Sequence, residues 1–284
     1  MSRVTYRMSW FTWIVGLGLL TGACGNGTAG SMPSTSASVS PRTSIDPSVT
    51  PSPPEEAPTT DPATVDETAA QRCTGEDGAV QDRVISAKGS RLVAAELGHG
   101  PTWAVFLHQT DGAGLCGWWT YGAHVAGRGV HVLLLDLCGY GRSICTKPLS
   151  SDQVAQAGAA VAFARKHGAR RVTVVGASMG GAVALPTART SRADAVVDLS
   201  GPPDWTGTDL DRDVRGLTMP TLLAASPEDP STVSAFRKAI RHVPSKVKRL
   251  EVVTGGHGYV MLGYPGNWSR LATTVERWIK GDYP

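Results

Sequence analysis

Three features are missing from this sequence of 284 residues, and each absence narrows what the chain can be. The apolar segment near the N-terminus, Trp10 to Leu20, is too short for a comfortable membrane span, which needs about 20 residues. No basic patch is interleaved with aromatic side chains, so we expect no nucleic acid partner. Neither Cys-x-x-Cys spacing nor paired histidines occur, so we expect no metal site.

Cysteine is scarce, with five in the whole chain. One lies near the N-terminus, and the others are Cys73, Cys116, Cys138 and Cys145. In an exported chain, four cysteines in the folded part predict two disulfides, with three possible connectivities.

The N-terminus has the layout of an export signal. Arg3 and Arg7 form a short basic region before the apolar segment, which ends in Leu20-Thr21-Gly22-Ala23-Cys24. Small residues directly before a cysteine resemble a bacterial lipoprotein signal, in which the cysteine is lipidated after cleavage. We therefore predict a signal peptide over residues 1–23, lipidation of Cys24, and a lipid anchor on the extracytoplasmic face of the cell membrane. An ordinary secretory signal and a retained signal anchor are the alternatives, and both also export the chain.

Residues 24–70 differ in composition from the rest of the chain. They are rich in Ser, Thr, Pro and Gly and contain no aromatic residue, so they cannot bury a core. We predict a disordered tether here, followed by one domain of ordinary size over residues 71–284. The net charge of +3 falls to about +1 if Arg3 and Arg7 leave with the signal.

Apolar runs alternate with helix-compatible segments along the predicted domain. This alternation predicts an α/β fold with a mostly parallel central sheet and helices on both faces. Ligands of such sheets bind at the carboxyl ends of the strands. The predicted strands are 92–97, 103–107, 130–135, 171–175, 193–199, 220–225 and 250–253, and the predicted helices are 152–167, the segment after Ser178, 231–242 and 268–280.

The most informative stretch is Gly176-Ala177-Ser178-Met179-Gly180-Gly181, which fits the pattern Gly-x-Ser-x-Gly. It follows the apolar run 172–175 and precedes a segment that can begin a helix. This strand–turn–helix context predicts a nucleophile elbow, a tight turn that exposes the hydroxyl of Ser178. The backbone N–H of Met179 then points to where an oxyanion would form. The alternative is a glycine-rich turn that serves packing alone.

A nucleophilic serine needs a base to take its proton and an acid to orient that base. We predict His257 as the base, because it lies in a glycine-rich loop directly after the last predicted strand. We predict Asp229 as the acid, because it follows the strand 220–225. Glu228 beside it and Asp204 after the preceding strand are the alternative acids, and Asp229 also suits the cap of the following helix.

A second oxyanion donor should come from the loop His108-Gln109-Thr110-Asp111-Gly112, after the strand that ends at Leu107. The backbone N–H of Gln109 or of Thr110 is suitably placed, and the sequence leaves both open. His108 is expected to organise this loop rather than to act as a second base.

The stretch Asp136-Leu137-Cys138-Gly139-Tyr140-Gly141-Arg142-Ser143 resembles a loop common in α/β-hydrolases, Asp-x-x-Gly-x-Gly-x-Ser. With the elbow and the chain order Ser178, Asp229, His257, the whole folded part resembles an α/β-hydrolase. The resemblance implies a structural loop, in which the glycines permit a tight turn and the acid and arginine fix it. Many related sequences have His-Gly where this chain has His108 followed by Gln109.

The resemblance implies three further features. The strands that end at Leu107 and Leu135 would be neighbours, so that Cys116 can reach Cys138 or Cys145. The interval from Gly201 to Thr218 is short, which implies little or no lid and an open, shallow pocket. Candidate pocket residues are Trp118, Trp119, Trp205 and Tyr259.

The sequence therefore predicts a serine hydrolase that cleaves carboxylic esters, or related acyl bonds, of a small-molecule acyl substrate through an acyl-enzyme. We expect neither a metal nor an organic cofactor, and a monomer. The alternatives are a peptidase or thioesterase of the same fold, and a non-catalytic cell-surface binding protein that keeps the hydrolase fold.

Overall fold

The computed structural model describes residues 68–74 and 80–283. The predicted signal peptide, the lipidation of Cys24 and nearly all of the predicted tether lie outside these residues. The predicted boundary between tether and domain, at residue 70, falls inside the short helix α1 (Ala69–Thr74). Within the described part, no helix has the length and apolar character to cross a bilayer.

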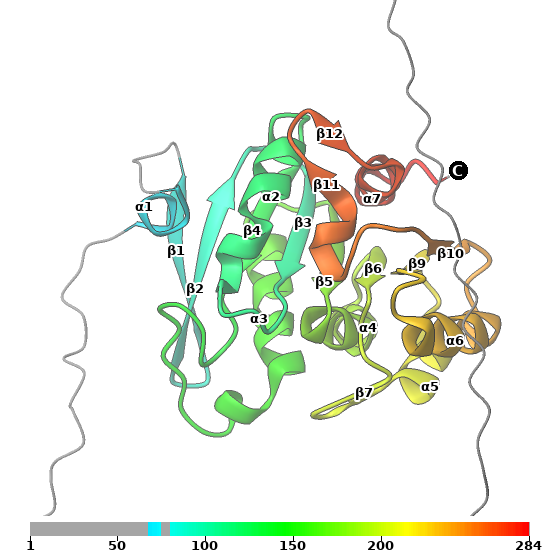
Figure 1. Cartoon of the computed structure of the whole chain (residues 1–284). Coiled ribbons are helices and arrows are strands. Elements are labelled where there is room, and N and C mark those ends of the chain that lie inside the picture. The colour runs from blue at the N-terminus through cyan, green and yellow to red at the C-terminus, as the bar shows by residue number, and fades with distance from the viewer. Residues whose placement is uncertain (1–67, 75–79, 284) are drawn as a thin grey trace, which may run out of the picture. The chain divides into compact units, whose positions relative to one another are not determined.

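The core of the fold is an eight-stranded sheet with the order β1-β2-β4-β3-β5-β6-β9-β10 (Figure 1). Strands β1 and β2 pair antiparallel, β2 pairs antiparallel with β4, and every other pair in this sheet is parallel. The prediction of a mostly parallel sheet is confirmed, and so are the neighbouring positions of β3 and β4. The strands are β1 (Gln81–Ala87), β2 (Ser90–Leu97), β3 (Thr102–Leu107), β4 (His131–Leu135), β5 (Arg171–Ala177), β6 (Ala195–Leu199), β9 (Thr221–Ala225) and β10 (Lys248–Val252).

Helices cover both faces of this sheet, as predicted (Figure 1). Side chains of α3, α4 and α6 share one apolar core, and those of α2 and α7 share the other. Strand β5 serves both cores, because alternate side chains point to opposite faces: Val172 and Val174 enter the first, and Val175 enters the second. The helices are α2 (Trp119–Ala126), α3 (Gln153–Lys166), α4 (Met179–Ser191), α6 (Pro230–Ala239) and α7 (Arg270–Lys280).

Short polar side chains start several of these helices. Asp152 caps α3 by accepting from the N–H of Ala155, and Ser269 caps α7 by accepting from the N–H of Ala272. Asp229 caps α6 in the same way. Sequence patterns missed β1 and α2: β1 is an exposed edge strand with few apolar residues, and α2 begins at Trp119, directly after Trp118 at its cap.

The interval from Gly201 to Thr218 holds little covering structure, as predicted. It contains a small hairpin, β7 (Asp204–Trp205) with β8 (Thr208–Asp209), then the helix α5 (Leu210–Asp213) and the single turn η3 (Val214–Gly216). The hairpin packs against α4, the helix that follows the predicted nucleophile.

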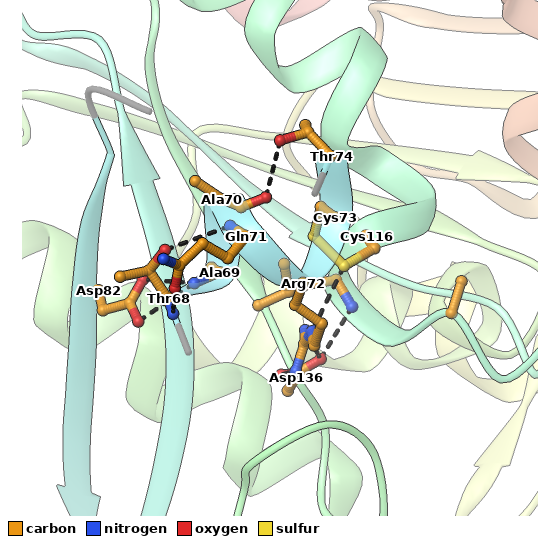
Figure 2. The surroundings of a disulfide bond; sticks show 12 residues. Thr68, Ala69, Ala70, Gln71, Arg72, Cys73, Thr74, Asp82, Cys116 and Asp136 are labelled. Atoms are coloured by element: carbon orange, nitrogen blue, oxygen red, sulfur yellow. Dashed lines mark hydrogen bonds and ion pairs between the residues drawn. A yellow bond between two sulfur atoms is a disulfide. The ribbon is translucent and has the colours of Figure 1, made fainter. Parts of the chain in front are cut away.

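The disulfides join Cys73 to Cys116 and Cys138 to Cys145. The pairing of Cys116 with Cys138 or Cys145, implied by family resemblance, is therefore wrong. Helix α1 brings Cys73 to Cys116, because the N–H of Ala69 bonds Asp82 on β1 (Figure 2). This short helix gave no sequence signal that placed it beside residue 116.

The loop after β4 is fixed differently from the family expectation. Asp136 is fully buried and binds Arg72 of α1 through two hydrogen bonds, of 2.8 and 3.0 Å (Figure 2). The arginine inside the loop, Arg142, instead pairs with Asp82 at 3.7 Å. Ser143 donates to the carbonyl of Asp136 at 2.7 Å, which closes the turn. The loop is structural, but its arginine partner comes from outside it.

Candidate active site

Ser178 sits at the junction between β5 and α4, in a backbone conformation that amino acids other than glycine rarely adopt. Its φ is 49° and its ψ is −119°. Its N–H donates to the carbonyl of Leu199 at 2.8 Å, and its carbonyl accepts from Gly181 at 2.8 Å. Backbone strain persists only where the surrounding structure imposes it, and strained residues cluster at functional sites. The conformation of Ser178 therefore makes it a candidate functional residue.

The glycines of the elbow are required by close approach of the backbone. A Cβ at Gly176 would overlap the carbonyl group of Gly180, and a Cβ at Gly180 would overlap the carbonyl oxygen of Leu107. The N–H of Gly180 also donates to the carbonyl of His108 at 3.2 Å. The elbow is therefore pressed directly onto the end of β3 and the loop that follows it.

His108 organises this loop, in the way the sequence suggested. Its Nε2 accepts from the N–H of Leu137 at 3.1 Å, so the ring proton is on Nδ1, which lies 2.8 Å from the carbonyl oxygen of Gln109. Burial lowers the pKa of His108, which keeps the ring neutral. The ring also contacts Tyr140, with 4.4 Å between centroids, so it joins the loops after β3 and β4.

Three backbone donors are available at this point. Among the described residues, the N–H groups of Gln109, Thr110 and Met179 donate to no other group of the protein. The side chain of Gln109 is held by Asp111, which accepts from its Nε2 at 3.1 Å. The sequence predicts these same amides as oxyanion donors. Because the N–H groups of Gln109 and Thr110 are both without an acceptor in the described part of the chain, either can be the second donor beside Met179.

His257 lies on the loop after β10, at the start of the turn η5 (Gly258–Leu262), and its ring is exposed. Glycines at 255, 256 and 258 all have positive φ, which lets the loop turn sharply around the histidine. Gly258 packs against both the side chain of Gln109 and Ala177, the residue before Ser178. The histidine loop therefore meets the elbow and the loop after β3 at one point.

The two candidate acids after β9 have different partners. Asp229 is half-buried, and its Oδ1 accepts from the N–H of Thr232 at 3.1 Å and from Oγ of Ser231 at 2.8 Å. Burial raises the pKa of Asp229, but these hydrogen bonds and the nearby charge of His257 outweigh burial and leave the pKa below its ordinary value. Asp229 is therefore an ionised group within electrostatic range of His257.

Glu228 instead ties two loops together. Its Oε2 accepts from the N–H of Gly256 at 2.9 Å and from Oγ of Ser226 at 3.1 Å. The remaining alternative, Asp204, is exposed on β7 and lines a depression of about 200 Å³ between the hairpin and α6.

No hydrogen bond joins Ser178 to His257, or His257 to Asp229, in the described part of the chain. Such bonds are often long in free enzymes and shorten when substrate binds.

The candidate pocket aromatics do not all face one space. Trp118 is fully buried and donates its indole N–H to the carbonyl of Leu107 at 2.9 Å, so it is a core residue. Tyr259 packs on Gly117 and on the ring of Trp118, with 5.4 Å between centroids. Trp205 is half-buried on the β7–β8 hairpin.

Sequence patterns missed Asp198, a buried acid directly behind the elbow. It lies on β6 against Gly181 of α4, and its Oδ1 accepts from the N–H of Gly201 at 2.7 Å. Its Oδ2 has no hydrogen-bond partner. Burial raises the pKa of Asp198 to about 7, although the bond from Gly201 lowers it. Inside the apolar strand Ala195–Leu199, its position could have signalled a buried acid.

The raised pKa of Asp198 should make stability depend on pH. The folded protein binds the proton of Asp198 more tightly than the unfolded chain does. The stability that this proton contributes is therefore complete below the ordinary pKa of 3.8 and declines as pH rises through about 7. We expect Asp198→Asn, which mimics the protonated acid, to lose this decline and to be more stable than the parent at about pH 8, by up to roughly 4 kcal/mol. Urea unfolding of both proteins at about pH 5 and pH 8 measures it. A difference between them that does not change with pH would contradict the assignment.

Comparison with known proteins agrees with this architecture. Residues 104–261 match the model of the family described as alpha/beta hydrolase fold, and the chain belongs to that family. The matched stretch contains the elbow, both acids after β9 and the histidine loop. A search of curated protein sequences finds no match.

Solved structures share the fold at low sequence identity. An esterase of Pyrococcus furiosus superposes with a TM-score of 0.59 at 16% identity, covering 71% of this chain and 90% of its own. A dienelactone hydrolase from Anabaena variabilis has a TM-score of 0.54 at 19% identity, covering 72% and 99%. A thioesterase domain from the curacin biosynthetic pathway has a TM-score of 0.53 at 14% identity, covering 72% and 100%. Membership of the family makes the chain a hydrolase. The similarities to solved structures, at low sequence identity, establish only its fold.

Proposed function

We propose that this protein is a serine hydrolase that cleaves carboxylic esters by way of an acyl-enzyme. The single observation that carries the proposal is the strained backbone of Ser178 at the β5–α4 turn, with φ 49° and ψ −119°. Packing alone does not account for a serine there, because glycine would adopt this conformation without strain.

The proposed reaction uses groups from the segments that follow β3, β5, β9 and β10. Oγ of Ser178 attacks the ester carbonyl carbon while His257 takes its proton. The N–H of Met179, with that of Gln109 or Thr110, stabilises the tetrahedral oxyanion. His257 then gives the proton to the leaving alcohol as the C–O bond breaks, and Asp229 stabilises the imidazolium. Water attacks the acyl-enzyme by the same steps and releases the acid.

The comparisons support an acyl-transfer enzyme without selecting its substrate. The similar structures include an esterase, a thioesterase domain and a dienelactone hydrolase. We favour esters because the short β7–β8 hairpin leaves the elbow little covered, which suits small or solvent-presented acyl groups. A thioesterase or peptidase of the same fold would use the same groups.

The test is hydrolysis of a p-nitrophenyl ester series, from acetate to decanoate, by the full chain kept in detergent. We expect turnover to be greatest for short acyl chains, since the β7–β8 hairpin is too small to cover a long one. A folded protein that hydrolyses none of the series would overturn the ester proposal. Turnover of thioester or amide substrates alone would then replace esters with one of those bonds.

We also propose that the chain is exported and anchored by a lipid on Cys24. The two disulfides support this, because such bonds persist in oxidising compartments outside the cytoplasm. Metabolic labelling with a palmitate analogue should mark the protein, and the label should be lost in Cys24→Ala. Equal labelling of the parent and of Cys24→Ala would contradict the proposed lipid anchor.

A further inference from the structure

Three side chains outside the proposed triad form a hydrogen-bonded row from the β7–β8 hairpin to the elbow. Trp205 on β7 donates its indole N–H to Oε1 of Gln153 at 2.7 Å. Nε2 of Gln153 donates in turn to Sδ of Met179 at 3.3 Å. The row connects the β7–β8 hairpin to Met179, the residue that directly follows Ser178.

The orientation of Gln153 within this row is fixed by chemistry. An indole N–H only donates, so the carboxamide oxygen must face Trp205 and its NH₂ group must face the sulfur of Met179. The backbone of Gln153 is held as well, because it is the first residue of α3 and Asp152 caps that helix. Each polar atom of the side chain therefore has a partner within the row.

Met179 connects the row to the chemistry. Its backbone N–H is the proposed first oxyanion donor, whereas its side chain is buried in the core shared by α3 and α4. Trp205 packs against the same core from the hairpin. The indole, the carboxamide and the thioether therefore make a continuous series of contacts from the hairpin through α3 to the elbow.

We infer that Gln153 and Trp205 are positioning and specificity-determining residues, which hold the Met179 thioether in place and thereby limit the size of the acyl group. The inference rests on the proposed ester hydrolysis. Breaking the row frees the hairpin and the thioether to move apart, so larger acyl groups fit. The backbone N–H of Met179 stays in the elbow, so hydrolysis of the smallest ester is little changed.

The test compares kcat and KM for p-nitrophenyl acetate and hexanoate. Trp205→Phe keeps an aromatic ring but loses the donor, and Gln153→Leu removes both polar contacts. In each variant we expect the kcat/KM ratio of hexanoate to acetate to rise about three- to tenfold, mainly through a lower KM for hexanoate. The matched control is Trp268→Phe, another half-buried tryptophan, which contacts Tyr121 and His124 instead and should leave the ratio unchanged.

A double-mutant cycle separates this role from general destabilisation. Met179→Leu keeps the volume but removes the sulfur acceptor, so Gln153→Leu should shift the ratio less on that background than on the parent. Unchanged ratios in variants that melt like the parent, or fully additive effects, would overturn the inference while ester hydrolysis stands. A parent that hydrolyses no ester overturns the proposed function and this inference with it. If Gln153→Leu does not fold, Trp205→Phe decides.

Discussion

Ser178→Ala loses ester hydrolysis by about 10⁴-fold or more in kcat while the protein stays folded. The loss is this large because no other group supplies the attacking oxygen, and only binding and the oxyanion donors remain. Steady-state hydrolysis of p-nitrophenyl acetate, with thermal melting as the check on folding, measures the effect. Residual activity above about one tenth of the parent would contradict a nucleophilic role for Ser178.

The strain at this position provides an independent control. Ser178→Gly is equally inactive, but we expect it to be about 1 kcal/mol more stable than Ser178→Ala, because glycine adopts φ 49° without a steric penalty. Urea unfolding of the two variants gives the difference. If the alanine variant is the more stable, the backbone at residue 178 is not strained, and the observation that carries the proposal is lost.

The second large effect distinguishes the two acids after β9. Asp229→Asn should lower kcat by about 10²- to 10⁴-fold, because an amide cannot stabilise the His257 imidazolium. Its stability should change little, since asparagine caps a helix as well as aspartate does. Glu228→Gln should lower kcat by less than about tenfold, because its carboxamide oxygen can still accept from Gly256.

The two variants together make the test specific. Both remove one negative charge from adjacent residues, so their overall electrostatic effects are closely matched. The reverse pattern, with Glu228→Gln inactive and Asp229→Asn near the parent, would assign the orienting acid to Glu228. Equal, small losses in both would leave His257 without an acid from this loop and would contradict the proposed triad.

Much of the fold could be predicted because the strands of a parallel sheet are buried on both faces. Runs such as residues 103–107 are therefore continuously apolar, and the structure has β3 at Thr102–Leu107. The elbow was predictable for a related reason. Its glycines are needed where the backbones of β5, α4 and β3 touch, and that need is visible as a local pattern.

Contacts between distant segments gave no such pattern. The disulfide partner of Cys116 depends on α1, a six-residue helix whose place is set by Asp82 and by the pairing of Arg72 with Asp136. The row from Trp205 to Met179 likewise joins three elements through side chains that are unremarkable in sequence. Pairwise tertiary contacts of this kind leave no local periodicity, so they became visible only in the structure.

The central claim, that Ser178 is the nucleophile, is tested most directly by a covalent label. The full chain is treated with a fluorophosphonate, digested, and analysed by mass spectrometry. The account predicts one adduct per chain, on the peptide that contains Ser178, and its loss in Ser178→Ala and in His257→Ala. A folded protein that takes no label, or one labelled at another serine, would contradict it.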